Sequence, residues 1–220
     1  MVRLGYILLA VALLWGPPPA SAQATFQFLP EIDVSHHFSP NFGFWFQVKQ
    51  TRENGQPNQA EFGPSLKYVP KGRLSLDPST GTITLALGYR YLAAPEAPGT
   101  NRLQPIVFFS VPLKGKAKIT DRNRADLDWQ NGSFTWTYRN RLAIKYPFTI
   151  RGYTPRPYAA AEAFYRSQYS KWSDTALYAG CEFPLGKHTV LEPYYEHQNV
   201  TGKSPNQQYN QIGVVLNLLF

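Results

Sequence analysis

Apolar and polar residues alternate along the last eleven positions of the chain. Counting back from the C-terminal Phe220 in steps of two gives Leu218, Leu216, Val214 and Ile212, which are all apolar, whereas the residues between them are smaller or more polar. A period of two is the signature of a β-strand with one apolar face. The segment is also long enough for a tilted strand to cross a lipid bilayer. The last strand of a secreted β-sandwich would show the same pattern, so the rest of the chain must distinguish the two.

The same alternation recurs throughout the chain, between residues that favour turns. The segments are about ten residues long, whereas strands of soluble sheets usually have about five or six. Segment 158–166 is rich in alanine, which favours a helix, but its position between two clear strands favours a strand. The eleven predicted strands are 28–37, 42–52, 61–69, 82–92, 102–113, 116–128, 134–146, 157–167, 174–185, 189–198 and 210–220.

The predicted fold class is all-β, an antiparallel transmembrane β-barrel, but eleven is an unexpected number of strands. Single-chain bacterial barrels have an even number, so we expect about twelve strands, with ten as the alternative. The additional strand would come from 23–29 or from a short strand at 73–76. We expect Pro64, Pro105 and Pro193 at bulges or strand ends, because a proline removes a donor from the ladder.

The first 22 residues have the features of a secretory signal peptide. Arg3 provides a positive charge, residues 4–15 form an apolar segment, and three prolines precede a small-x-small cleavage site at 20–22. The apolar segment is too short for a transmembrane helix. We therefore expect residues 1–22 to be removed and 23–220 to be exported as one barrel domain, located in the bacterial outer membrane.

The composition fits a barrel better than it first suggests. Hydrophobic residues make up only 43% of the sequence, the mean hydropathy is −0.34, and aromatic residues reach 15%. In a barrel only alternate residues face lipid, and aromatic residues form belts at both membrane surfaces. The net charge of +8 would suggest nucleic acid as the partner of a soluble protein. For an exported barrel, outer-membrane lipids and anionic lipopolysaccharide are the expected partners, and no nucleic acid is expected.

Strand parity places the charges on the inner face, because an Arg or Lys at the lipid midplane costs about 2–4 kcal/mol. The predicted basic wall of the lumen consists of Arg90, Arg122, Arg124, Arg139, Arg141 and Lys145. The predicted acidic wall consists of Glu31, Asp33, Glu162, Glu182, Glu192 and Glu196. Since the last strand closes the sheet against the first, we expect the two walls to face each other.

Two interpretations of these walls remain open. The charges can pair across a small lumen and fill it, because buried charges need partners. Alternatively, they line a narrow water-filled passage whose transverse field favours a polar or zwitterionic solute. The first interpretation describes a structural barrel with a plugged lumen, and the second describes a porin-like pore.

Three segments resemble a known family. They are T-W-T-Y-R-N-R-L-A-I-K-Y-P (135–147), L-Y-A-G-C-E-F-P-L (177–185) and L-E-P-Y-Y-E-H-Q (191–198), together with the terminal L-N-L-L-F. They are similar to the bacterial family called domain of unknown function 2490, predicted outer-membrane barrels, over essentially the whole mature chain. The resemblance implies a barrel and supplies no catalytic residues.

The C-terminal strand resembles the assembly signal of bacterial outer-membrane barrels. Its candidate residues are Phe220, Leu218, Leu216 and Val214. The resemblance implies the barrel-assembly machinery and periplasmic chaperones as partners. We expect the inserted barrel to be a monomer.

Catalysis is not expected. His197, in the segment 195–199, distantly resembles the H-x-S-N stretch of barrel lipid A deacylases, but no serine stands two residues after it. Ser35 could align only with His37, because adjacent residues of a strand face opposite sides. Four scattered histidines and the single Cys181 offer no metal-ligand spacing, so we expect no metal, cofactor or disulfide. A lipid-modifying outer-membrane hydrolase and a soluble exported β-sandwich that binds a ligand are the alternative functions.

Overall fold

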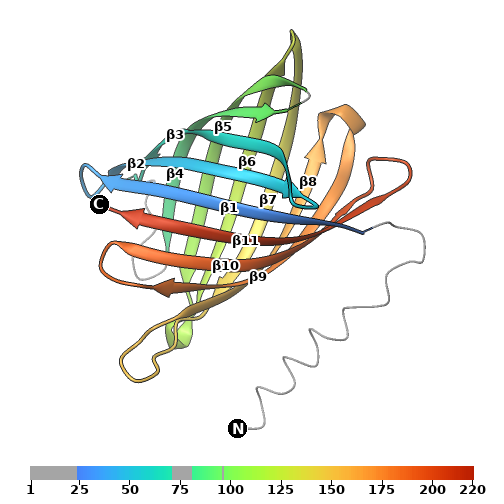
Figure 1. The fold of residues 1–220 in the computed structure, drawn as a ribbon. Helices are drawn as coiled ribbons and strands as arrows, with labels where there is room; N and C mark the ends of the chain where they lie inside the picture. The colour runs from blue at the N-terminus through green and yellow to red at the C-terminus, as the bar shows by residue number, and fades with distance from the viewer. Residues whose placement is uncertain (1–23, 71–80, 96) are drawn as a thin grey trace.

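The computed structural model describes residues 24–70, 81–95 and 97–220. Within these residues one sheet closes on itself to form a β-barrel (Figure 1). The predicted signal peptide, 1–22, and the candidate strand 73–76 lie outside the described residues. Among the residues that are described, no helix is both long and apolar enough to span a membrane.

Eleven strands make up the described barrel, and each contains most of one predicted strand. The alanine-rich segment is a strand, β8, as its position in the sequence predicted. Two short 3₁₀ turns, η2 (Lys114–Lys116) and η3 (Ser167–Tyr169), lie between strands. The strands are β1 (Ala24–His37), β2 (Phe42–Glu53), β3 (Gln56–Tyr68), β4 (Thr82–Ala94), β5 (Ala97–Pro112), β6 (Lys118–Gln130), β7 (Ser133–Lys145), β8 (Arg156–Arg166), β9 (Lys171–Pro184), β10 (Thr189–Val200) and β11 (Gln207–Leu219).

The barrel closes through a parallel pair. β1 lies parallel to β11, with Ala24 opposite Gln208 and Ser35 opposite Leu219, whereas every other neighbouring pair in the described sheet is antiparallel. Antiparallel neighbours alternate in direction, so an odd number of strands can close only if one pair is parallel. The expectation of twelve strands is therefore wrong for the described residues. The N-terminal residues 24–29 lengthen β1 and do not add a strand.

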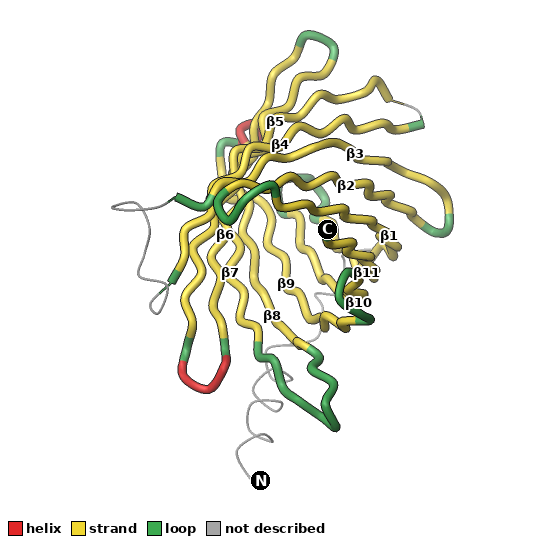
Figure 2. Tube along the Cα trace, turned by 90° about the vertical axis from the view of Figure 1, so that its left-hand side faces the viewer, coloured by secondary structure: helices red, strands yellow, loops and turns green. Residues whose placement is uncertain are grey.

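The strands are strongly tilted, as barrel closure requires. In Figure 1, β1, β2, β10 and β11 cross in front of β5, β6 and β7 at a steep angle. Figure 2 shows the barrel from the side on which the C-terminus lies in Figure 1, with the strands arranged around that end. The two sides of the barrel therefore face each other across the lumen with their strands crossed.

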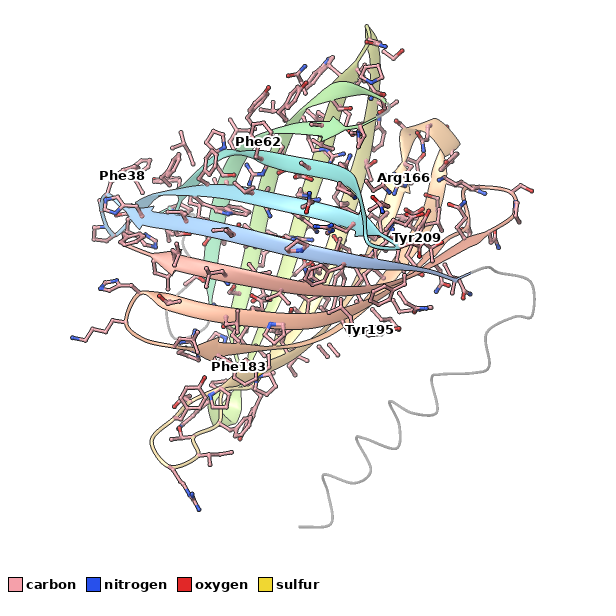
Figure 3. The ribbon with its side chains drawn as sticks, viewed as in Figure 1. Phe38, Phe62, Arg166, Phe183, Tyr195 and Tyr209 are labelled. Atoms are coloured by element: carbon pink, nitrogen blue, oxygen red, sulfur yellow. The ribbon has the colours of Figure 1, made fainter. Side chains whose placement is uncertain are left out.

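Alternate residues point to the outer and the inner face. On β4, Leu87 and Tyr89 are exposed outside, whereas the neighbouring Arg90 is fully buried inside. Phe38 and Phe62 are likewise exposed and project from the outer surface (Figure 3). Among the described residues, thirty large hydrophobic side chains are exposed, and the buried ones include slightly more polar or charged residues than hydrophobic ones. The distribution is thus inverted relative to that of a soluble protein.

Each of the prolines Pro64, Pro105 and Pro193 coincides with a gap in one of its two ladders. Pairing is interrupted beside Pro64 in β3–β4, beside Pro105 in β5–β6 and beside Pro193 in β10–β9. The register is the same on both sides of each gap, and the register shifts of the described sheet occur elsewhere. The expectation of bulges or strand ends at these prolines is therefore wrong. They remove hydrogen bonds on one side only and leave the strand in register.

One polar cluster lies on the outer face, between β6 and β7. The Asp121 carboxylate accepts hydrogen bonds from the Asn140 amide at 2.7 Å and from the Asn123 amide at 3.0 Å. The Tyr138 hydroxyl in turn donates to the Asn123 carbonyl oxygen. These residues satisfy one another, so a carboxylate on the outer face has neutral donors and no cation.

Candidate functional site: the barrel lumen

A cavity of about 550 Å³ lies in the lumen. Every strand except β4 contributes lining residues, most of which are polar or charged. The cavity is the candidate functional site because it collects the charged residues of strands that are far apart in the sequence. Its lining suits water and small polar solutes.

Glu162, on β8, is the centre of one ion-pair cluster. Its side chain is completely buried, and its Oε1 accepts hydrogen bonds from Arg122 Nη2 at 2.7 Å and Arg139 Nε at 2.8 Å. Its Oε2 accepts from Arg139 Nη2 at 3.1 Å and lies 2.8 Å from the Tyr178 hydroxyl. We call Glu162, Arg122 and Arg139 the Glu162 cluster. Three guanidinium N–H groups compensate the carboxylate charge in a place where an unpaired charge would be very costly.

A second set of pairs lies on β5 and β6. Arg102 forms a bidentate pair with Asp128, at 2.6 and 2.8 Å. Asp126 is 2.9 Å from Arg124 Nε and accepts a hydrogen bond from the Gln104 amide at 3.0 Å. These residues extend the network of compensated charges from the Glu162 cluster towards β5.

Arg90 forms hydrogen bonds within the barrel wall and does not line the cavity. Its side chain is fully buried, and Nη1 donates to the carbonyl oxygens of Gly63 and Pro64 at 2.9 and 2.8 Å. Nη2 donates to the Ser65 hydroxyl at 3.0 Å. The guanidinium thus satisfies acceptors at the place where Pro64 interrupts the β3–β4 ladder. The sequence predicts Arg90 in the basic wall of the lumen, and the structure buries its guanidinium in the barrel wall, where Nε also donates to the cavity-lining Gln47 at 2.9 Å.

Two further pairs involve β9. Glu182 contacts Lys145 and lies 3.3 Å from Arg156 Nη1. Asp174, whose side chain is completely buried, accepts a hydrogen bond from Arg166 Nε at 2.8 Å. Both carboxylates are held by cations from neighbouring or next-neighbouring strands, as Glu162 is.

The charges of a second group are not compensated by ion pairs. Arg141 lines the cavity with its guanidinium carbon 3.8 Å from the centre of the Tyr178 ring. Glu192 accepts a hydrogen bond from the Tyr158 hydroxyl at 2.7 Å, and Glu196 accepts one from the Tyr178 hydroxyl at 2.9 Å. We call these five residues the Tyr178 group. Within the described residues, no ion pair involves Arg141, Glu192 or Glu196, although Lys49 interacts electrostatically with Glu196 and Lys145 with Glu192 over longer distances.

Two glycines provide the space in which the side chains of Tyr158 and Tyr194 lie along the barrel wall. A Cβ at Gly213 would lie 2.0 Å from Tyr194 Cζ, and a Cβ at Gly180 would lie 2.7 Å from Tyr158 Cζ. Tyr194 is opposite both glycines in the sheet register, and Tyr158 is opposite Gly180. The rings therefore occupy the space above the glycines, which leaves the centre of the lumen open.

Ion pairs in the described barrel run around the wall. Each joins residues of one strand, of neighbouring strands or of strands two positions apart. The pair between Arg122 on β6 and Glu162 on β8 is an example of the widest span. No ion pair in the part of the chain that the structure describes joins opposite sides of the lumen.

The predicted walls are only partly separate. Eight predicted residues line the cavity: Arg122, Arg124, Arg139, Arg141, Glu31, Asp33, Glu192 and Glu196. Glu162 and Glu182, assigned to the acidic wall, instead lie among the basic residues. The physical reason is that β8 pairs directly with β7, which places Glu162 opposite Arg141. Strand parity predicts the face of a residue, but its neighbours depend on the register between strands.

Several residues of the lumen were not predicted. Arg102, Arg166 and Asp174 form ion pairs, and Tyr158 and Tyr178 hold carboxylates. Arg102 could have been found, because its parity matches that of the other inward residues and it lies opposite Asp128 in the register. The tyrosines carry no such signal, because an inward tyrosine and an outward one look alike in sequence.

The histidine candidates lie away from this cavity. His197 Nδ1 is 2.9 Å from Asn210 Oδ1, and the Tyr195 hydroxyl donates to the same oxygen at 2.7 Å. The His37 ring lies beside Gly43, where a Cβ would meet its Nδ1 at 3.2 Å. No group of three potential metal ligands occurs among the described residues.

The C-terminal Phe220 forms backbone hydrogen bonds with the end of β1 and so helps to close the sheet. The backbone of Phe220 donates to the Ser35 carbonyl at 2.8 Å and accepts from His37 at 3.2 Å. Its ring is exposed and stacks with His188 at a centroid distance of 6.1 Å. Leu218, Leu216 and Val214 lie in the outward register of β11, at the seam with β1.

A closed β-barrel with an apolar outer face and a hollow, charged interior defines the class of this protein. Within that class, the chain belongs to the family described as "Protein of unknown function (DUF2490)", whose family model matches residues 26–210. The resemblance found in the sequence is thereby confirmed. A comparison with curated proteins found no match.

Proposed function

We propose that the chain is an integral protein of the bacterial outer membrane that forms a narrow polar pore. The proposal of a membrane location rests on the inverted distribution of residues. A soluble monomer exposes few large apolar patches, whereas this barrel exposes Phe28, Ile32, Leu87, Leu142 and other large apolar side chains on several strands. Lipid is the environment in which such a surface is stable, and a closed barrel leaves no unpaired strand edge in it.

Aromatic residues near both ends of the barrel support the same location. On β7, Phe134 and Trp136 are exposed near one end, and Tyr146 is exposed just after the strand at the other. Trp136 stacks with Tyr165 at a centroid distance of 5.4 Å, and near the opposite end Phe42 lies 4.8 Å from Tyr68. Aromatic belts at both membrane surfaces are characteristic of outer-membrane barrels.

The proposal of a pore rests on the arrangement of the ion pairs. They run around the wall and leave a polar cavity of about 550 Å³. A plugged lumen would need charges that pair across it, and the described pairs compensate charge without crossing. The lumen therefore holds water and fixed charges, the combination that selects ions and polar solutes in pores.

Conductance in planar bilayers tests the pore. We expect wild type to give discrete current steps, and neutralising Arg139, Arg141, Arg122 and Arg124 to shift the ion selectivity towards cations, because the wall loses positive charge. The location is tested separately by fractionation of the full-length protein and by heat-modifiable migration on gels. An electrically silent barrel in the outer-membrane fraction would support the plugged alternative and overturn the pore. Recovery of the protein as a soluble species after carbonate extraction would overturn the membrane location.

We also propose that the barrel-assembly machinery and periplasmic chaperones deliver the chain and that β11 carries the recognition signal. The exposed ring of Phe220 contributes little to the core, so its deletion tests recognition more than stability. The deletion should lower the amount in the outer membrane. Normal insertion of the deletion variant would contradict this role. In the membrane the monomeric barrel contacts phospholipid and lipopolysaccharide.

A further inference from the structure

The Tyr178 group combines charges of both signs within one part of the lumen. The Arg141 guanidinium lies on the face of the Tyr178 ring, and the Glu196 carboxylate lies at the hydroxyl of the same ring. A positive and a negative group are thus separated by about one tyrosine side chain. Glu192 lies on the hydroxyl of the neighbouring Tyr158.

The hydrogen bonds around Tyr178 leave a carboxylate short of donors. The Tyr178 hydroxyl is 2.8 Å from Glu162 and 2.9 Å from Glu196, but a phenol has one proton to donate. Glu162 has the guanidinium groups of Arg122 and Arg139 in addition. Glu196, which is buried, has no cation within ion-pair distance in the described barrel. The Glu196 carboxylate, which lies at the ring that carries Arg141, therefore presents a place for an ammonium group.

From this geometry we propose that the Tyr178 group binds a small zwitterion of the amino-acid class. The solute carboxylate pairs with Arg141, and its ammonium group pairs with Glu196. The inference deepens the proposed function and rests on it, because the lumen is the route by which a solute reaches the group.

The surroundings favour a zwitterion over a simple ion. An anion at Arg141 would lie near the Glu196 carboxylate, and a cation at Glu196 would lie near Arg141. A solute with both charges compensates both groups. The rings of Tyr178 and Tyr194, whose centroids are 6.2 Å apart, add aromatic surface of the kind that attracts ammonium groups. Pockets for small molecules usually have volumes of about 300–1,000 Å³, and this cavity falls within that range.

Two solutes of equal size and no net charge test the proposal. L-alanine carries both charges, whereas lactamide has a hydroxyl and an amide in their place. Millimolar L-alanine should reduce the potassium chloride current through the single wild-type channel, and lactamide should not. Neither solute alters the ionic strength, so the difference isolates the dipolar interaction. Equal block by both solutes, or no block by L-alanine, would overturn the proposal.

Two substitutions locate the effect. Arg141→Gln and Glu196→Gln should each weaken the block by L-alanine about tenfold or more, because each removes a hydrogen bond to a charged group. Lys67→Gln removes one positive charge from the described barrel at a place beside Trp45, outside the Tyr178 group. This control should keep the wild-type block. Unchanged block in both variants would place the solute elsewhere and overturn the assignment.

Equilibrium dialysis of labelled L-alanine against the detergent-solubilised protein separates this inference from the pore. Binding that is lost in Arg141→Gln, in a protein that carries no current, would contradict the pore and support the site. A current without binding and without block would contradict the site and leave the pore intact. Each variant is used only if it retains heat-modifiable migration, which reports the folded barrel.

Discussion

The Glu162 cluster and the Tyr178 group meet at the Tyr178 hydroxyl, which lies 2.8 Å from Glu162 and 2.9 Å from Glu196, yet they differ in how charge is compensated. In the cluster, the completely buried Glu162 is held by two guanidinium groups. In the group, Arg141 lies on the face of a ring, and Glu192 and Glu196 lie at phenol hydroxyls. The charges of the cluster form ion pairs, whereas those of the group form none among the described residues.

The difference follows from strand register and side-chain direction. Arg141 is opposite Glu162 in the β7–β8 register, yet Arg139 and Arg122 occupy its oxygens. Because the Glu162 oxygens are occupied by Arg122 and Arg139, Arg141 forms no ion pair with Glu162 and lines the cavity instead. Residues of the same type on one strand therefore have different roles, and substitutions should separate a region that stabilises the barrel from one that interacts with solutes.

The largest effect is expected for Glu162→Gln. The amide cannot compensate Arg122 and Arg139, and breaking a buried ion pair by removing one partner costs about 3–5 kcal/mol. Urea unfolding of the barrel in lipid vesicles, followed by tryptophan fluorescence, measures the loss. Glu53→Gln is the matched control, because among the described residues Glu53 accepts hydrogen bonds from the amides of Gln27 and Asn58 and forms no ion pair. A loss for Glu162→Gln no greater than for Glu53→Gln would remove the distinction between the two regions.

Gly213→Ala should have the next largest effect, about 1–3 kcal/mol, which is typical of overpacking. The new Cβ would lie 2.0 Å from Tyr194 Cζ, so the tyrosine must move into the lumen and the single-channel current should fall. Gly186→Ala, with no atom within 4 Å of the added Cβ, is the control.

A double-mutant cycle identifies the cause of that effect. If the contact with Tyr194 is responsible, Gly213→Ala should add little to Tyr194→Ala. Additive losses of stability in the cycle would show that the cost of Gly213→Ala does not come from its contact with the Tyr194 ring.

The sequence could predict the strands and their faces but not these two regions. Alternation located the cores of all eleven strands and placed Arg139 and Arg141 inside. The number of strands was wrong, because the closing pair is parallel, and no local pattern records the direction of β1 relative to β11. The partners of Glu162 depend on diagonal contacts across β6, β7 and β8. Such contacts are set by strand stagger, which a single sequence does not reveal.

Lys145→Gln should cost less than about 1 kcal/mol, as for a partly exposed ion pair. The Lys145 side chain is 35% exposed, and its partner Glu182 keeps Arg156 at 3.3 Å. Urea unfolding in vesicles measures the cost beside Glu162→Gln. A cost comparable to that of Glu162→Gln would show that pairs near the strand ends stabilise the barrel as strongly as the buried cluster.

Arg141→Gln should change the stability least. The substitution loses a cation–π contact, worth about 0.5–1 kcal/mol or more. It also removes a cation that the described barrel holds without an ion pair, and removal of such a charge is favourable. The two effects oppose each other, so the free energy of unfolding should stay within about 0.5 kcal/mol of wild type while the current and its block by L-alanine change. A loss near that of Glu162→Gln, with an unchanged current, would mean that Arg141 belongs to the structural cluster and that the lumen has no separate solute-binding region.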